Sequence, residues 1–272
     1  MITFSGEKFE LKLIKLNDVL LHEECEDNRY EKLMQRFIDD GVLYNPLIVG
    51  KHNDSYILID GANRYKALKA LGAKLILAQI VNYKSKNVVL KSWYHFVNGM
   101  ELADVRDFIY GEDIEIRKFK GSSLKKLNLL GITGTTGRSL MIKLKSRLEE
   151  ILDFLCRFSK YYENRFNYTR VDSQIPLRNI RDFFKTQGLL IIYPAFRKEH
   201  IVKIAKMSQK LPAGVSRHLI PNRVLKIKYD IENLMSDKRI ADKNSELMEL
   251  IEYKIQNKKV RLYREPVFIF DE

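Results

Sequence analysis

The chain has 272 residues, of which 45% are hydrophobic, so it can bury a sizeable core and form one or two domains. No apolar run reaches the roughly 18 residues of a membrane span and the start lacks a signal-peptide pattern, which predicts a soluble cytoplasmic protein. The two cysteines, Cys25 and Cys156, have neither a CxxC nor a metal-ligand spacing and are expected to be thiols that pack.

The first hundred residues alternate between strand and helix patterns and predict one α/β unit. The apolar spacing from Tyr30 to Phe37 is helical, and two short apolar runs flank Asn53-Asp54, a turn signal typical of a β-hairpin. The expected elements are an edge strand at 8–16, a helix at 28–40, hairpin strands at 47–50 and 56–60, a helix that begins after Gly61, and strands at 75–81 and 88–97.

Residues 101–190 predict a mostly helical and basic section, in which Arg147 to Phe158 gives the clearest amphipathic pattern. Residues 131–139, GITGTTGRS, invite comparison with a phosphate-binding P-loop. A Walker A loop needs a lysine directly after its last glycine, and none stands there, so we interpret the segment as a flexible turn.

Residues 191–272 alternate again between helix and strand. The expected elements are a helix at 196–208, a loop at Pro212, a strand near 223–227, a charged helix at 243–256 and a final strand at 266–270. The chain is therefore predicted to be an α/β (α+β) protein in three sections, 1–100, 101–190 and 191–272.

The segment from Leu58 to Gly72 carries the strongest chemical signal. A buried strand stops at Asp60, Gly61 permits close backbone approach, and a helix follows that Gly72 ends. The first helical turn, with Arg64 and its backbone amides, suits a phosphate, and Asp60 suits a metal ion or a hydroxyl beside it. This pattern predicts phosphoryl chemistry. The alternative is an ordinary strand–helix unit with a surface Asp and a solvated Arg, because the motif is short.

The net charge of +13 makes nucleic acid an obvious candidate partner. Basic residues are dense at Arg117, Lys118, Lys120, Lys125 and Lys126, and they continue at Lys143, Lys145 and Arg147 on an expected helix. Aromatic residues do not interleave with them, as a stacking platform for bases requires. A solvated face, or an electrostatic funnel for phosphate donors, explains the run equally well, so nucleic-acid binding is expected to be weak and non-specific.

The junction at Asp60 also resembles the phosphate-binding helix start of the ParB/sulfiredoxin superfamily. Sulfiredoxins have a nucleophilic Cys where this chain has Ala62, and ParB partition proteins have two arginines where Asn63-Arg64 provides one. The branch that more of the chain resembles is the free L-serine kinases, including the siderophore-pathway serine kinase and the archaeal-type ADP-dependent serine kinase. The segments that carry this resemblance are LHEE at 21–24 with Arg29, NPLIV at 45–49, IDGANRY at 59–65, SWYH at 92–95, LPAGVSRH at 211–218 and YREPV at 263–267.

The resemblance implies how the phosphoryl group would be handled. It places a catalytic glutamate at Glu23, the general base for the substrate hydroxyl, although Glu24 or Glu26 beside it is an alternative. It also implies that Asp60 binds Mg²⁺ or orients the nucleophile. The phosphates of the donor would be held by Gly61, Ala62, Asn63 and Arg64. Asn63 departs from the family, which often has His there, and this puts one phosphate or metal contact in doubt.

The amino-acid substrate needs partners for its carboxylate and its ammonium group. In the Pro-Ala-Gly loop, Ser216, Arg217 and His218 offer a hydroxyl, a guanidinium fork and an imidazole, with Ser216 replacing the threonine of the family. Trp93 and His95 are two apart on an expected strand and so share one face, where they are expected to line the substrate pocket. The alternatives are that Trp93 packs in the core and that His95 is a hydrogen-bonded structural histidine.

The sequence thus predicts a kinase that converts free L-serine to O-phospho-L-serine. The resemblance implies Mg²⁺ as cofactor, ATP or ADP as donor, and a place in amino-acid metabolism, in cysteine biosynthesis. No residue pattern reads an adenine ring, and the basic surface also leaves room for inorganic polyphosphate. The alternative is a ParB-like DNA-binding regulator that nucleotide switches, against which stand the missing second arginine and the lack of a recognisable helix-turn-helix.

Overall fold

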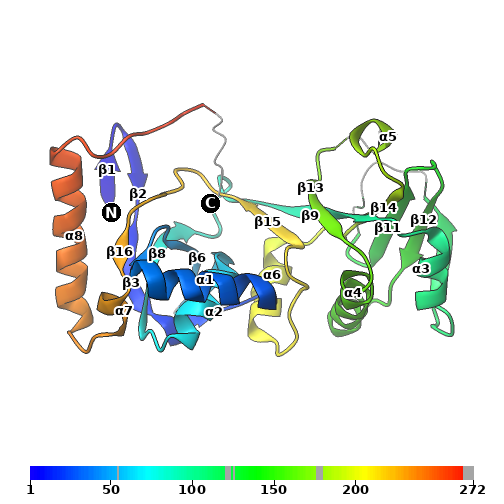
Figure 1. Ribbon diagram of the computed structural model, residues 1–272, viewed down its shortest axis with the longest axis horizontal. Helices are drawn as coiled ribbons and strands as arrows, with labels where there is room; N and C mark the ends of the chain where they lie inside the picture. The colour runs from blue at the N-terminus through cyan, green and yellow to red at the C-terminus, as the bar shows by residue number, and fades with distance from the viewer. Residues whose placement is uncertain (54, 120–123, 125, 176–179, 266–272) are drawn as a thin grey trace. The chain divides into compact units, whose positions relative to one another are not determined.

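The computed structural model describes residues 1–53, 55–119, 124, 126–175 and 180–265 (Figure 1). Contacts group the chain into two compact units, each assembled from segments that are far apart in the sequence. Unit 1 comprises Met1–Val19, Asn28–Asn82 and Asn222–Glu272, and unit 2 comprises Leu20–Asp27 and Tyr83–Pro221. The limits at residues 100 and 190 that the sequence suggested are not limits of these compact units.

Unit 1 is built on a five-stranded sheet. Its strands are β3 (Leu11–Lys15), β4 (Val19–Leu20), β6 (Leu47–His52), β7 (Ser55–Asp60) and β8 (Leu75–Asn82). The order is β3-β8-β6-β7-β4, in which β6 and β8 are parallel, β3 runs antiparallel to β8, and β7 runs antiparallel to β6. The apolar runs at the centre are almost fully buried, as expected for strands that are covered on both faces. Smaller antiparallel pairs join β1 (Ile2–Phe4) to β2 (Glu7–Phe9) and β5 (Val42–Leu43) to β16 (Tyr229–Asp230).

The helices of unit 1 are α1 (Asp27–Asp40), α2 (Ala62–Ala70), α7 (Glu232–Met235) and α8 (Ile240–Gln256). Asn244 attaches α8 to the edge strand β3, because its Oδ1 accepts from the Leu13 N–H at 2.9 Å and its Nδ2 donates to the Leu13 carbonyl at 3.1 Å. An edge strand presents backbone groups that need such partners. The structure confirms the helices expected at 28–40 and 243–256, the edge strand, the 47–60 hairpin and the strand at 75–81.

Unit 2 is built on a seven-stranded sheet whose known pairings are antiparallel. Its strands are β9 (Val89–Asn98), β10 (Glu115–Lys118), β11 (Leu129–Gly134), β12 (Ser139–Lys143), β13 (Tyr168–Asp172), β14 (Gly188–Ile192) and β15 (Ser216–Leu219). The order is β10-β12-β11-β14-β9-β13, and β15 pairs with the first half of β9. The long strand β9 therefore touches three other strands and organises the unit.

The mostly helical middle section predicted from the sequence is wrong. Residues 101–190 contribute strands β10 to β14, together with α3 (Leu102–Phe108), α4 (Leu148–Glu163) and α5 (Ile180–Phe183). Only α4 follows the amphipathic pattern found there, and it buries one face that runs from Leu148 to Tyr162. The GITGTTGRS segment forms the β11–β12 hairpin, in which the Gly134 N–H donates to the Arg138 carbonyl at 2.8 Å. A strand–turn–strand unit lacks the helix N-terminus that a P-loop needs, which agrees with rejecting that interpretation.

Three smaller expectations in this half of the chain have different outcomes. The helix expected at 196–208 is confirmed as α6 (Lys198–Lys206). The strand expected near 223–227 is wrong, because these residues have no regular secondary structure. The strand expected at 266–270 lies outside the described residues. No helix in the described ranges is both long and apolar enough to cross a membrane.

The described residues of the basic run are not helical, and an acidic side chain partly balances their charge. Arg117 and Lys118 lie exposed on β10, Lys143 ends β12, and Arg147 precedes the first residue of α4. Arg117 and Lys143 both pair with Glu115, the latter at 3.0 Å. Lys120 and Lys125 lie outside the described residues. Nucleic-acid binding through this face stays a prediction.

We expect Gly188→Ala to destabilise unit 2 because a β-carbon at this buried position would overlap the Val97 carbonyl and come within 2.8 Å of Phe96 Cζ. Such overpacking against backbone costs about 1–3 kcal/mol of unfolding free energy. The matched control is Gly131→Ala, whose β-carbon would lie 3.3 Å from Ile192 Cβ, a close contact without overlap. Urea unfolding followed by the fluorescence of Trp93, the single tryptophan, measures both, and equal losses would contradict the argument.

Candidate functional site

The residues that the sequence singled out fall into two groups, one in each compact unit. Unit 1 holds Asp60, Gly61, Ala62, Asn63 and Arg64. Unit 2 holds Glu23, Trp93, His95, Ser216, Arg217 and His218.

The group in unit 1 lies where β7 ends and α2 begins. Gly61 is the N-cap of α2 with φ of 102°, a left-handed conformation that favours glycine. Arg64, in the first turn, donates from Nη2 to Asp60 Oδ2 at 2.7 Å and from Nη1 to the carbonyls of Asn45 and Pro46 at 3.0 and 2.7 Å. A β-carbon on residue 61 would lie 3.1 Å from Arg64 Nε, so the guanidinium packs over the glycine. Arg64 is therefore a fixed part of the junction, contrary to the alternative of a solvated surface Arg.

A second arginine at this junction was not found from the sequence. Arg223, in the irregular segment that follows Asn222, donates from Nη1 to the same Asp60 Oδ2 at 2.9 Å. Two guanidinium groups and the N-terminus of the nine-residue α2 thus surround one carboxylate. Such a cluster has an excess of positive charge and suits an anion. A lone arginine gives no local signal in a chain with 48 lysine and arginine residues.

The side chains around Asp60 determine whether the expected Mg²⁺ could bind there. Among the described residues, no three His, Cys, Asp or Glu side chains converge in a way that would hold a metal ion. Mg²⁺ commonly takes only one or two protein carboxylates and completes its shell with water and substrate phosphates. Asp60 has the chemistry for that limited role, as a single ligand beside a bound phosphate. It does not form a metal site by itself.

In unit 2, Glu23 is tied to the Pro-Ala-Gly loop by backbone hydrogen bonds. Its Oε1 accepts from the Ser216 N–H and its Oε2 accepts from the Gly214 N–H at 3.3 Å. The backbone around Glu23 also forms a parallel bridge with the loop. The Glu24 N–H donates to the Leu211 carbonyl, and the Leu211 N–H donates to the His22 carbonyl. Each carboxylate oxygen has a second lone-pair direction, so the two amide bonds leave acceptor capacity on both.

The loop residues that follow Gly214 lie on β15 beside Trp93. Arg217 stacks on the Trp93 ring, with its Cζ 4.2 Å from the ring centroid, and it pairs with Asp172 on β13. Trp93 is partly exposed, so it is not simply a core residue. Ser216 Oγ lies 2.8 Å from His22 Nε2, and His218 Nε2 lies 2.9 Å from the Tyr83 hydroxyl. Trp93, Ser216, Arg217 and the Glu23 carboxylate are therefore brought together, whereas the His218 ring is directed to Tyr83.

His95 is in a different position from the one expected. Its exposed fraction is 0%, its ring stacks on Tyr168 at 4.8 Å between centroids, and its two nitrogens bond inward. Nδ1 lies 2.6 Å from the Tyr162 hydroxyl and Nε2 lies 3.0 Å from the Gly214 carbonyl. Burial lowers the pKa of His95 to about 4, although the bond to Gly214 opposes this. The geometry supports the structural alternative for His95 and gives it no place on a substrate-facing surface.

Arg170 is a further residue that the sequence did not reveal. It lies on β13, pairs with Glu26, and packs against Gly214 where a β-carbon would overlap its guanidinium. Burial lowers the pKa of Arg170, while the nearby Glu23 carboxylate raises it. The two neighbouring carboxylates thus have different partners: Glu26 pairs with Arg170, and Glu23 accepts from the loop amides. The strand that carries Arg170 lay in the section predicted to be helical, so its neighbours could not be foreseen.

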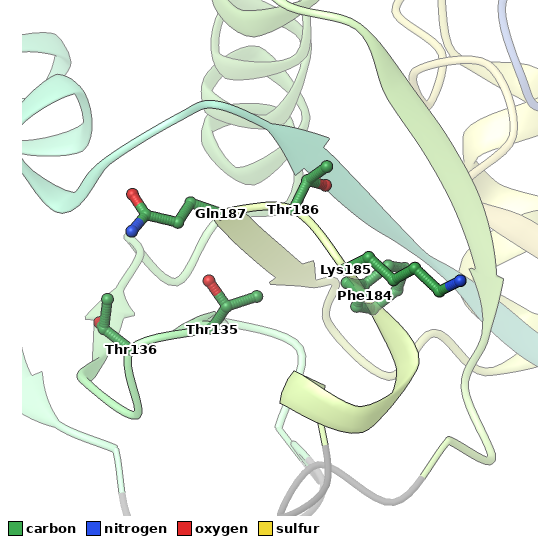
Figure 2. A pocket seen from close by; sticks show the side chains of 6 residues that line it. All are labelled: Thr135, Thr136, Phe184, Lys185, Thr186 and Gln187. Carbon is green, nitrogen blue, oxygen red and sulfur yellow. The ribbon is translucent and has the colours of Figure 1, made fainter.

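Two further features of unit 2 are its cysteines and a surface hollow. No disulfide joins the two cysteines; the Cys156 thiol donates to the Lys210 carbonyl, and burial raises its pKa to about 12. A hollow of about 330 Å³ lies between the β11–β12 turn and the segment before β14, and Figure 2 shows the side chains that line it. Its lining consists of Thr135, Thr136, Phe184, Lys185, Thr186 and Gln187. Thr135 and Thr136 belong to the GITGTTGRS segment, and none of the candidate catalytic or binding residues lines this hollow.

Comparison with known proteins relates the chain to one group. The ParB N-terminal domain family matches residues 6–92, a stretch that ends within β9. The chain is 29% identical over 224 residues to the ATP-dependent L-serine kinase of Staphylothermus marinus, covering 77% of this chain and 85% of that protein. It is 27% identical over 236 residues to the ADP-dependent L-serine kinase SerK of Thermococcus kodakarensis, covering 84% and 94%.

A solved structure shows the same fold. The C-terminally truncated SbnI from Staphylococcus aureus superposes with a TM-score of 0.71 at 19% identity, covering 92% of this chain and 97% of that one. The similarity extends well beyond the ParB N-terminal domain. The likeness shows that the fold of this chain is a known one.

The buried His95 predicts a loss of stability in acid. Its pKa in the folded state, about 4, is below the value of 6.5 expected in the unfolded chain. Between these values the unfolded chain binds a proton that the folded chain does not, so stability falls as pH drops from 6.5 to 4. The maximal slope for one proton is about 1.4 kcal/mol per pH unit, and the sum is about 3 kcal/mol. In His95→Gln, the unfolding free energy measured with urea between pH 4.5 and 7 should depend on pH less steeply than in the wild type, by the contribution of about one proton. Parallel curves of unfolding free energy against pH would contradict this.

Proposed function

We propose that this chain, a ParB N-terminal domain protein related over most of its length to ATP- and ADP-dependent free L-serine kinases, phosphorylates free L-serine. The observation that carries the proposal is the alignment with two L-serine kinases over 77% and 84% of the chain. In the reaction, the serine hydroxyl oxygen bonds to the terminal phosphorus of the nucleotide and the anhydride P–O bond breaks. The hydroxyl proton passes to a base, giving O-phospho-L-serine with ADP from ATP or AMP from ADP.

Glu23 is our candidate for the base. The amides of Gly214 and Ser216 hold both of its oxygens and fix the direction of the carboxylate. Because each oxygen keeps a second acceptor direction, the carboxylate can take the proton of a hydroxyl placed within hydrogen-bond reach. Glu26 is less suited, since its carboxylate pairs with Arg170.

The amino-acid acceptor is assigned to the surface formed by Trp93, Ser216 and Arg217. Arg217 keeps 25% of its side chain exposed and has a guanidinium fork that suits a substrate carboxylate. Stacking on Trp93 holds that fork in one plane. Asp172, which pairs with Arg217, is our candidate for the partner of the substrate ammonium group.

The phosphates of the donor are assigned to the junction of β7 and α2. The N-terminus of α2, Arg64 and Arg223 supply positive charge there, and Arg64 is held in place by its bonds to the Asn45 and Pro46 carbonyls. Mg²⁺ would be held by Asp60 and would supply charge neutralisation on the phosphates. ATP and ADP are both candidates because the two aligned relatives differ in this respect, and polyphosphate remains a further donor to test.

We expect L-serine and Mg²⁺ with ATP or ADP to give O-phospho-L-serine, measured by ³¹P NMR, with polyphosphate as a third arm. Glu23→Gln should lower kcat by roughly 10²-fold or more, the usual effect of removing a general base. Glu24→Gln is the matched control and should stay near wild type, because the neighbouring residue joins the loop through its backbone N–H. Product from none of the three donors would refute the kinase. Equal turnover in both variants would move the base elsewhere.

Arg223→Gln should raise the KM for the nucleotide by roughly tenfold and change kcat little, since it removes a charge-assisted contact beside the phosphates. The matched control is Lys226→Gln in the same segment, where the backbone N–H and not the side chain contacts Asn45. Both variants remove one positive charge, so a general electrostatic effect would shift both KM values equally. That equal shift would contradict a direct role for Arg223.

A further inference from the structure

Three buried rings in unit 2 form a single series of hydrogen bonds that ends on the Pro-Ala-Gly loop. The Tyr193 and Tyr162 hydroxyls lie 2.6 Å apart, the Tyr162 hydroxyl lies 2.6 Å from His95 Nδ1, and His95 Nε2 lies 3.0 Å from the Gly214 carbonyl. Each of the three rings is at most 2% exposed. The members come from β9, α4 and the residue that follows β14, so three elements of the fold converge on one loop carbonyl.

The position of each hydrogen in this series follows from the groups that can only accept. A carbonyl can only accept, so His95 Nε2 carries hydrogen and donates to Gly214. The neutral ring then leaves Nδ1 as an acceptor, which the Tyr162 hydroxyl satisfies by donating to it. Tyr162 in turn accepts from Tyr193. Burial raises the pKa of both tyrosines and lowers that of His95, so this protonation pattern holds across the neutral pH range.

Gly214 connects this series of hydrogen bonds to Glu23, the candidate base. Its φ is 71°, and glycine samples both signs of φ with similar ease, so its backbone needs a contact that selects one conformation. The carbonyl side of the residue is held by His95, while its N–H donates to Glu23 Oε2 at 3.3 Å. The next residue but one, Ser216, donates to the other oxygen of Glu23. A rotation of the Gly214 carbonyl away from His95 would therefore move the amides that hold Glu23.

We propose that His95 is a positioning residue which, through the Gly214 carbonyl, fixes the loop amides that orient the Glu23 carboxylate. This inference rests on the proposed function for its catalytic consequence, and on the hydrogen bonds alone for its structural one. His95 touches neither substrate nor donor in this scheme. Its contribution is the direction of one peptide group.

Two substitutions at residue 95 separate the two ends of the ring. The amide nitrogen of Gln stands as many bonds from Cα as Nε2 of histidine, so His95→Gln keeps a donor for Gly214. The amide of Asn stands where Nδ1 does, so His95→Asn keeps a partner for Tyr162 and loses the bond to Gly214. Both variants place the same neutral amide in the core, which makes each the control for the other.

The first readout is independent of activity. Hydrogen–deuterium exchange by mass spectrometry should show peptides covering 211–218 exchanging about tenfold faster in His95→Asn and within about threefold of wild type in His95→Gln, because exchange follows local opening. Peptides of β10 and β12, at the other end of the strand order from β9, should be unchanged in both. Equal exchange in the two variants, or faster exchange throughout unit 2, would show that His95 only fills the core and would overturn the proposal.

The second readout is kinetic. His95→Asn should lower kcat by roughly 10–10²-fold, the effect of a small misplacement of a reacting group, and leave the nucleotide KM unchanged. Combined with Glu23→Gln it should cost little more than Glu23→Gln alone, because residues that act through one another are not additive. Fully additive losses would overturn the proposal. Absence of kinase activity in the wild type would refute the proposed function, and the exchange experiment would still decide the role of His95.

If His95→Asn does not fold, Tyr162→Phe replaces it in the exchange experiment. This variant keeps the ring volume and removes the hydroxyl that donates to Nδ1, so the imidazole loses one of the two bonds that fix its orientation and its hold on Gly214 weakens. Faster exchange confined to 211–218 supports the positioning role. Unchanged exchange of that segment overturns it.

Discussion

The proposed binding surface for serine depends on the backbone hydrogen bonds that hold the Glu23 carboxylate. Hydrogen bonds from the backbone to an ionised carboxylate are among the stronger ones in proteins, and here the amides of Gly214 and Ser216 supply two of them. They join segments that are separated by about 190 residues and explain why Leu20–Asp27 belongs to unit 2 although its sequence neighbours belong to unit 1. The start of β15, and with it Arg217, has its place because this clamp fixes the loop.

The two carboxylates of interest have opposite surroundings, which suit different tasks in the proposed reaction. Asp60 accepts from two guanidinium groups, which balance its charge and leave the junction attractive to phosphates. Glu23 accepts from neutral amides, and Arg170, whose guanidinium packs against Gly214 and interacts electrostatically with Glu23, is paired with Glu26. A carboxylate held by two amides keeps spare acceptor directions for a proton. The assignment of Glu23 as base and Asp60 as phosphate-side residue follows from this difference.

Sequence patterns predicted unit 1 better than unit 2 for physical reasons. The 47–60 hairpin and the strand at 75–81 combine apolar runs with turn residues, and both were found. In unit 2, Gly188–Ile192 is a buried apolar run without alternation, and the glycine-rich 129–134 segment gives no strand period, so a hairpin and a central strand were missed. Glu23 and Ser216 could be paired only through family resemblance. Arg170 and Arg223 gave no signal, because their partners come from distant segments.

The position of His95 shows what the alternation of a strand can and cannot establish. It placed Trp93 and His95 on one face of β9, but depth along that face depends on neighbouring elements: Trp93 borders β15 and stays partly exposed, while α4 and the residue after β14 enclose His95. An imidazole held neutral there can orient Gly214 without adding charge beside Glu23. A lysine or arginine in its place would also donate to the carbonyl, but its charge would oppose proton uptake by the carboxylate. A buried neutral donor is therefore the kind of group that can position a general base without weakening it.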